Sequence, residues 1–315
     1  MYFSSMYRVA ISTLQLFLRL CLIMFIVTGL HSCKYDKPPT ERNRVSFKAM
    51  AGINYIEVKR RFGDGLSVSK YGYGLTPSWK MSFNSDDTAQ VFSPDANAFL
   101  KFRITLDHDS LFHVARTWFR AKKITKDSLV LQVMKVQSKV IYLDKSQVFL
   151  TFYSDKYIHD ELHTVPQALM GKTRSDTLFI KRRSAEVNAK PDSGFIATNS
   201  PVFTSRTPLA TVKKIETKAS VMNGYDNFDL PKYDITIRNK YKNFNYPELV
   251  VVIDYKGQVN YLYSMWQLAE GGNETIKVIM DNYVKTYFKI TPGNTFGINH
   301  NCYAYINLKG IKISD

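Results

Sequence analysis

Residues 45–158 alternate apolar and polar side chains with a period of two, and turn signals interrupt the alternation at short intervals. This pattern is typical of antiparallel strands with one buried face. The segments 99–106 and 111–119 flank the polar stretch 107–110 and predict a hairpin. Further strands are predicted at 53–62, 79–83, 128–136, 140–143 and 148–153, with a Gly/Tyr-rich loop at 63–77. So many short strands in succession predict a barrel or a sandwich, and barrel closure would remove exposed edges.

The C-terminal part follows a different plan, with strands and one helix. Strands are predicted at 233–241 and 248–265, the latter as a hairpin whose turn ends at Gly257. Residues 271–290 have helical spacing, with Asn273 as the expected N-cap and Pro292-Gly293 as the stop. The expected buried face of that helix consists of Ile276, Ile279, Met280, Tyr283, Tyr287 and Ile290. A last strand is predicted at 301–313.

The predicted fold class is therefore a mainly β N-terminal domain, an antiparallel barrel or sandwich, followed by a smaller α+β domain. Between them, 159–210 is the least regular stretch, with one possible strand at 177–183 and a Pro/Ser/Thr-rich end typical of a linker. The predicted organisation is a signal peptide at 1–32, a tether at 33–44, a β domain at 45–158, an irregular connector at 159–210 and an α+β domain at 211–315.

The first residues have the parts of a secretory signal. Arg8 and Arg19 are the only charges, and the apolar run from 20 to 30 precedes small residues. A membrane-spanning helix is the alternative, but it needs about 20 apolar residues. It would have to begin near Val9 and bury Arg19 near its middle, which costs roughly 3 kcal/mol.

The end of this leader, Leu30-His31-Ser32-Cys33, resembles a bacterial lipobox. In lipoproteins the cysteine becomes the lipidated first residue of the mature chain, so the resemblance implies a lipid on Cys33. An ordinary cleaved signal with an incidental cysteine is the alternative. Several acyl chains on one cysteine anchor a protein stably, and the polar residues 34–44 suit a tether. The implied location is the envelope of a diderm bacterium, the outer membrane rather than the inner, facing the periplasm or the outside.

Two further resemblances concern the folded parts. The N-terminal strands, with Trp79, Trp118 and the run 124–133, are similar to the small lipocalin-like β domains of exported lipoproteins. That similarity implies a barrel with either a ligand cavity or an ordinary packed core. The C-terminal run of 250–259, the amphipathic helix, Pro292-Gly293-Asn294 and the final strand resemble the C-terminal domain of TonB-like energy transducers. In that family the domain binds an extended peptide by adding a strand at the sheet edge.

The chain is strongly basic, with a formal net charge of +16. For an exported protein, the expected anionic partners are lipid headgroups, lipopolysaccharide or acidic glycans, and not nucleic acid. A solvated basic surface is the alternative. Cys21 would leave with the leader and Cys33 would carry lipid, so only Cys302 remains and no disulfide framework is expected. A Cys33–Cys302 bridge is possible only if the lipobox interpretation is wrong.

Few residues suggest chemistry. His159 and His163 are four apart, as in zinc sites on one helix face, but the acids between them do not match the metalloprotease order, so a polar connector is the alternative. The segment 107–109 with His113 is expected to be a hairpin turn, and Cys302 near His300 a half-buried structural cysteine. Tyr71, Tyr73 and Trp79 form an aromatic cluster that would stack on sugars or only pack. No cofactor motif is present.

These observations support three hypotheses. The first is a lipid-anchored envelope protein with a non-catalytic binding or structural role, whose partner is an envelope protein or an anionic glycan or lipid. The second is an adaptor that captures a peptide by strand addition at the C-terminal sheet edge. The third is a metal-dependent hydrolase that uses His159 and His163.

Overall fold

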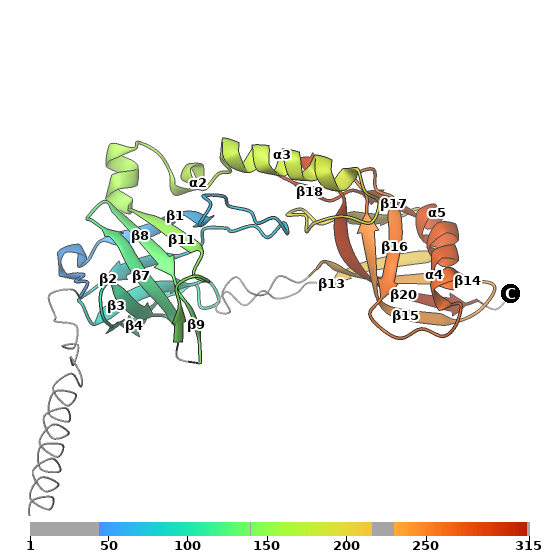
Figure 1. Ribbon diagram of the computed structural model, residues 1–315, viewed down its shortest axis with the longest axis horizontal. Coiled ribbons are helices and arrows are strands. Elements are labelled where there is room, and N and C mark those ends of the chain that lie inside the picture. The colour runs from blue at the N-terminus through green and yellow to red at the C-terminus, as the bar shows by residue number, and fades with distance from the viewer. Residues whose placement is uncertain (1–43, 139, 216–229, 314–315) are drawn as a thin grey trace, which may run out of the picture. The chain divides into compact units, whose positions relative to one another are not determined.

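The computed structural model describes residues 44–138, 140–215 and 230–313. The predicted signal peptide, Cys33 and the tether up to residue 43 lie outside the described residues. Over the described ranges the chain is mainly β, with an N-terminal antiparallel near-barrel and a C-terminal mixed sheet accompanied by a helix (Figure 1). The predicted fold class is confirmed.

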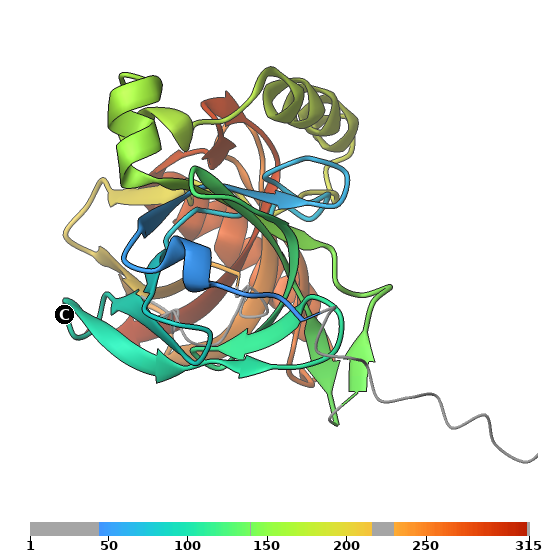
Figure 2. The same cartoon turned by 90° about the vertical axis from the view of Figure 1, so that its left-hand side faces the viewer.

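The N-terminal part is one nine-stranded antiparallel sheet with the order β4-β3-β2-β1-β11-β8-β7-β6-β5. Figure 2 shows this sheet curling round on itself. A short 3₁₀ turn, η2 (Lys48–Met50), precedes it. The strands are β1 (Asn54–Phe62), β2 (Lys80–Phe83), β3 (Thr88–Ser93), β4 (Ala98–Arg103), β5 (Thr105–Leu106), β6 (Leu111–Val114), β7 (Thr117–Ile124), β8 (Ser128–Val133) and β11 (Val148–Ser154). Between the last two, β9 (Lys135–Gln137) and β10 (Val140–Tyr142) form a separate hairpin.

Side chains fill the interior of the near-barrel. Phe47 stacks on Phe83 with ring centroids 4.1 Å apart and meets Phe112 edge-on at 4.9 Å. Phe119 and Phe152 are also fully buried. Each such side chain contributes about 1.5–3 kcal/mol by leaving water. Of the two alternatives for this domain, these buried side chains favour the packed core.

The strand predicted at 111–119 is wrong in one respect, because β6 and β7 divide it. A two-residue turn at Ala115 and Arg116 joins them, with φ of +47° and +64°. Positive φ at both central residues is the geometry of a type I′ hairpin turn, which favours Asn-Gly. Ala-Arg carries no such signal, so the alternation hid the turn.

The segment after β11 is more regular than its composition predicted. It contains the π-helical turn η3 (Tyr157–Glu161), the short helix α2 (Pro166–Leu169) and the longer helix α3 (Arg174–Asn188). The strand predicted at 177–183 is therefore wrong, since these residues lie inside α3. The physical reason is a capping box in which the Thr173 hydroxyl accepts from the Asp176 N–H and the Asp176 carboxylate accepts from the Thr173 N–H.

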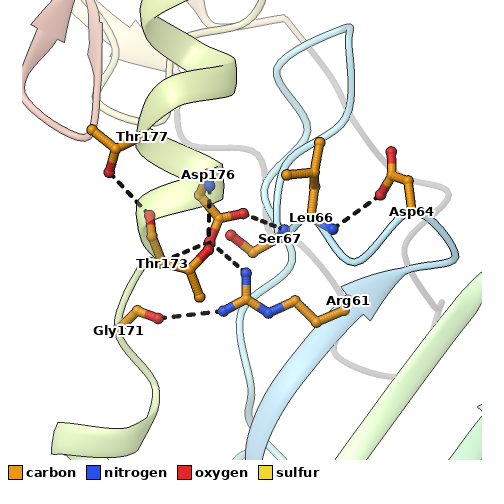
Figure 3. Close-up of polar contacts among 8 residues, drawn as sticks. All are labelled: Arg61, Asp64, Leu66, Ser67, Gly171, Thr173, Asp176 and Thr177. Atoms are coloured by element: carbon orange, nitrogen blue, oxygen red, sulfur yellow. Dashed lines mark hydrogen bonds and ion pairs between the residues drawn. The ribbon is translucent and has the colours of Figure 1, made fainter.

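Asp176 also ties this helix to the loop after β1 (Figure 3). Its buried carboxylate accepts hydrogen bonds from the Ser67 N–H (2.7 Å), from Thr173 and from the guanidinium of Arg61. Burial acts to raise the pKa of Asp176, but the hydrogen bonds from Ser67, Thr173 and Arg61 outweigh it and lower the pKa to about 2. The carboxylate is fully satisfied, which is the condition for burying a charge.

The C-terminal part is a five-stranded mixed sheet with the order β13-β14-β20-β15-β16. The central pair β14–β20 is parallel, and the other pairs are antiparallel. The strands are β13 (Ala210–Ile215), β14 (Lys232–Asn239), β15 (Phe244–Ile253), β16 (Val259–Ser264) and β20 (Cys302–Lys312). Shorter strands form two further pairs: β12 (Val202–Ser205) with β17 (Phe288–Thr291), and β18 (Asn294–Thr295) with β19 (Ile298–Asn299).

One face of this sheet is covered by a continuous helical segment that consists of α4 (Gly272–Ile279), the π-helical turn η5 (Met280–Val284) and α5 (Lys285–Tyr287). Ile276, Ile279 and Met280 are buried against the sheet, as predicted. The predicted N-cap is wrong: Gly271, at φ +72°, precedes the helix, and Asn273 lies inside it. The predicted end is also wrong, because Phe288–Thr291 pair with β12 as a strand. Gly257 has the positive φ (+87°) expected of its turn.

A small third core lies around α3. Val68 from the loop after β1, Ile180 and Val187 from α3, and Phe195 are buried together. None of the helices in the described ranges has the length and apolar character that crossing a membrane requires.

Candidate functional site: the open face of the C-terminal sheet

The two faces of the C-terminal sheet differ in chemistry. Along β14, Tyr233, Ile235 and Ile237 point into the core under the helix. Since side chains alternate along a strand, Lys232, Asp234 and Thr236 occupy the opposite face. On β20, Asn307 and Lys309 belong to that same face, because Ile306 and Leu308 are in the core. We call this second face the open face.

The strand register brings these polar side chains into rows. Asp234 pairs with Asn307, and Thr236 pairs with Lys309. On the other side of β20, Lys309 pairs with Asn245 of β15. Neighbouring strands lie about 4.8 Å apart, so the side chains of each row are within reach of one another. The Asn307 amide confirms this by donating to Asp234 Oδ1 over 2.7 Å.

A β-bulge in β15 aims an acid at this face. The register of β15 on β20 shifts between Tyr246 and Leu249. Within the shift, Glu248 has a φ of +49°, which a non-glycine residue adopts only at a cost of order 1–3 kcal/mol. Its backbone N–H donates to Asn307 Oδ1 over 2.9 Å. Bulges commonly re-aim a side chain beside a functional site.

The carboxylate of Glu248 holds two neighbours in place. Lys232 Nζ lies 2.9 Å from Oε1, and Trp266 Nε1 donates to Oε2 over 3.1 Å. The hydrogen bond from Lys232, then that from Trp266, lower the pKa of Glu248 below its usual value. The carboxylate is therefore charged at neutral pH, and it orients an indole ring that is 60% exposed.

These residues surround a pocket of about 430 Å³. Most of the residues that line it have polar side chains, and they come from three strands and the segment after β16: Lys232, Asp234, Ile235, Thr236, Asn245, Pro247, Glu248, Trp266, Asn307 and Lys309. The volume lies at the lower end of the range for small-molecule sites. Within the part of the chain that the structure describes, the Lys309 ammonium has no ion-pair partner.

The aromatic cluster predicted in the N-terminal domain is only partly assembled. Tyr71 and Tyr73 lie together, with ring centroids 6.1 Å apart, and Tyr71 is 57% exposed. Trp79 packs edge-on against Phe119 at 5.3 Å, on the near-barrel core. Trp79 is thus a packing residue, and the two tyrosines are what remains of that candidate stacking surface.

The predicted geometry of the histidine pair is wrong. His159 lies in η3, where its Nδ1 is 2.9 Å from the carbonyl oxygen of Asp155. The helical turns end at Glu161, and His163 has a φ of +46° outside them. The two imidazoles therefore do not share a helix face. Over residues 44–138, 140–215 and 230–313, no group of three or more His, Cys, Asp and Glu side chains is arranged to hold a metal ion.

The remaining candidates have structural roles. His108 lies in the turn between β5 and β6, with Nδ1 3.1 Å from Asp107 Oδ1. His113 packs on Trp118 at 5.2 Å, and burial lowers its pKa. His300 is buried and stacked on Phe195 at 3.6 Å, and burial lowers its pKa to about 4.

Cys302 is fully buried, and its Sγ lies 3.6 Å from the carbonyl oxygen of Ile253. Burial raises the pKa of this thiol to about 12. It is more deeply buried than the half-buried position expected. Cys33, with which it could pair only if the lipobox interpretation were wrong, lies outside the described residues.

Neither a scan against protein-family models nor a comparison with curated proteins gives a match for this chain. The pocket was missed in the sequence because its residues come from distant segments. One signal was present: the Pro247-Glu248 pair directly precedes the apolar run 249–253, and proline inside a strand often marks a bulge.

Proposed function

We propose that this protein is a lipid-anchored protein of the cell envelope with a non-catalytic binding role, and that it binds its ligand on the open face of the C-terminal sheet. The observation that carries the binding role is Glu248. A strained, positive-φ residue that fixes both Lys232 and an exposed tryptophan beside a pocket is a costly arrangement for structure alone.

The surroundings of Glu248 support binding rather than packing. Tyr263, Met265 and Trp266 follow one another near the end of β16, and each is more than half exposed. Tryptophan and tyrosine are enriched where proteins bind partners, since they combine apolar area with a polar atom.

The anchor rests on Leu30-His31-Ser32-Cys33 and the polar residues that follow. The near-barrel agrees with the resemblance to lipocalin-like domains of exported lipoproteins, and the hairpin, helix and final strand agree with the resemblance to TonB-like C-terminal domains. Both family assignments remain part of the proposal.

The anchor is tested by labelling cells with a fatty-acid probe. The full chain should become labelled and sediment with membranes, whereas Cys33→Ala should lose the label. A labelled Cys33→Ala variant, or an unlabelled wild type, would remove the anchor from the proposal.

The binding role is tested separately by placing a photo-crosslinking amino acid at Asn245, which lines the pocket. The same amino acid at Lys277, on the exposed side of α4, is the matched control. We expect adducts from position 245 and not from 277. The absence of any position-specific adduct in cells would contradict a binding role for this face.

A second candidate function is peptide capture by strand addition at β16. In the described sheet, β16 is an edge strand that pairs only with β15. An edge presents unpaired backbone N–H and C=O groups to a partner strand. Tyr263→Lys on this edge should abolish capture of the partner, while Tyr241→Lys, in the exposed loop after β14, should not. If Tyr263→Lys still captures every partner that the wild type captures, strand addition at β16 is excluded.

A further inference from the structure

The exposed indole of Trp266 is held like a platform. Its N–H is fixed by Glu248, so the ring cannot turn freely, yet 60% of the residue is exposed. An aromatic face presented in this way offers apolar area to a flat partner with C–H groups on one side. A sugar ring has such a face, with hydroxyl groups around its rim.

The pocket beside the indole has unused polar capacity of both kinds. Asp234 accepts from Asn307 through Oδ1, which leaves Oδ2 as an acceptor. Thr236 and Asn245 line the pocket on either side of Lys309, and their side chains supply both donors and acceptors. A mixed set of this kind suits hydroxyl groups, which donate and accept at once.

The charged side chains of the pocket bear on whether it prefers a neutral or an acidic sugar. Of the pocket's two acids, Glu248 is paired with Lys232 and accepts from Trp266, while Asp234 accepts a hydrogen bond from the neutral Asn307 amide. Of the pocket's two ammonium groups, that of Lys309 has no ion-pair partner among the described residues. A carboxylate is one of the groups that such a cation binds with a charge-assisted hydrogen bond. The net charge of the chain, +16 in full and +14 without Arg8 and Arg19 of the leader, would also raise the local concentration of an acidic polymer.

We infer that the pocket binds an acidic glycan, with one sugar ring stacked on Trp266 and a sugar carboxylate at Lys309. The volume of about 430 Å³ suits a short stretch of such a chain. This inference rests on the proposed binding role of the same face and names the class of its ligand.

The test uses the full chain in a detergent without a sugar headgroup. Binding is measured on an array of uronic-acid oligosaccharides of several linkages, each beside its carboxyl-reduced, neutral counterpart. We expect the wild type to bind acidic members at least about tenfold more tightly than their reduced counterparts. Lys309→Gln should lose that preference, whereas Lys277→Gln on α4 should keep it.

The platform is tested with Trp266→Ala and Trp266→Phe. The alanine variant should lose about tenfold or more in affinity for acidic and reduced members alike, and phenylalanine should restore most of it, because it keeps a ring. Tyr241→Ala, an exposed aromatic outside the pocket, should bind as the wild type does.

Two results would overturn the inference: no binding to any array member, or equal binding to acidic and reduced members. The crosslinks from position 245 separate this failure from that of the binding role. If the array is negative but a protein adduct forms at 245, the glycan inference is wrong and the binding role stands. If neither is seen, both are wrong.

Discussion

Asp176 is the residue whose charge is most tightly built into the described fold. Its buried carboxylate receives Arg61, Ser67 and Thr173. We predict that Asp176→Asn lowers the free energy of unfolding by about 3 kcal/mol, since it leaves a guanidinium that is only 15% exposed without its counter-charge. Denaturant unfolding at pH 7 measures this loss. Glu186→Gln, at an exposed ion pair on the same helix, should change stability by less than about 1 kcal/mol.

The same residue predicts how stability depends on pH. The pKa of Asp176 is about 2 in the folded protein and near the ordinary value of 3.8 in the unfolded chain. A carboxyl group whose pKa is lower in the folded state stabilises the protein at pH values above its unfolded-state pKa. This stabilisation is lost as the pH falls through the folded-state pKa. The wild type should therefore lose about 2 kcal/mol from this group between about pH 4 and pH 2. Over that pH range, the free energy of unfolding of Asp176→Asn should change by about 2 kcal/mol less than that of the wild type. If the two proteins show the same pH dependence, the low pKa assigned to Asp176 is wrong.

Cys302 gives a third prediction at this scale. A fully buried thiol with a pKa of about 12 has almost no thiolate at neutral pH, and the thiolate is the reactive form. In a chain with Cys21→Ala and Cys33→Ala, a thiol reagent at pH 8 should modify Cys302 only as fast as the protein unfolds. The measurement compares labelling rates with and without denaturant. Stoichiometric labelling within seconds of the native protein would show that the thiol is accessible.

At the scale of elements, two glycine turns form a matched pair. Gly257 and Gly297 both have positive φ, +87° and +82°. A Cβ at Gly297 would meet nothing within 4 Å, whereas one at Gly257 would lie 2.2 Å from the carbonyl oxygen of Ile290. Gly297→Ala should therefore cost about 1 kcal/mol, the backbone strain alone. Gly257→Ala should cost clearly more. Thermal unfolding of the two variants measures the difference, and equal losses would mean that the Ile290 contact is relaxed.

The elements also show what the sequence can predict. The period-two alternation located most strands because each has one buried face, as the pattern of β11 shows. Helix α3 was missed because few of its side chains are both apolar and buried: only Ile180 and Val187 are. Its start is marked by Thr173 and Asp176, which form the capping box three residues apart. That signal is weak, because the apolar run TLFI (177–180) directly after it suggests a strand. The turn at Ala115 and Arg116 was hidden because neither residue favours positive φ.

At the scale of the whole molecule, the candidate site is the part that the sequence could not reveal. Lys232, Glu248, Trp266 and Lys309 meet only because β20 inserts between β14 and β15, in a parallel pairing with β14. Such a pairing cannot be read from alternation, which gives strands but not their order. The bulge that aims Glu248 is likewise set by the partner strand.

The last prediction concerns cooperativity across the described residues from Val45 onward, which form one compact unit. The loop after β1, helix α3 and Phe195 share a buried cluster, and the Ile196 N–H donates to the carbonyl of Tyr71 over 2.9 Å. Chains of this size often unfold domain by domain. These contacts instead predict that the most protected amides of β11 and β20 exchange by the same global opening, with free energies within about 1 kcal/mol of each other.

Hydrogen exchange followed by mass spectrometry tests this, and Gly72→Ala is the decisive variant. A Cβ at Gly72 would lie 1.9 Å from the carbonyl oxygen of Ile196, and φ there is +89°. The substitution should therefore disrupt the junction between the loop and the segment after α3 without touching either main core. We expect the opening free energies of β11 and β20 to separate in Gly72→Ala, whereas Gly65→Ala, at φ +83° in open space, should leave them equal. If the two strands already differ by several kcal/mol in the wild type, then the sheets unfold independently and the third core does not couple them.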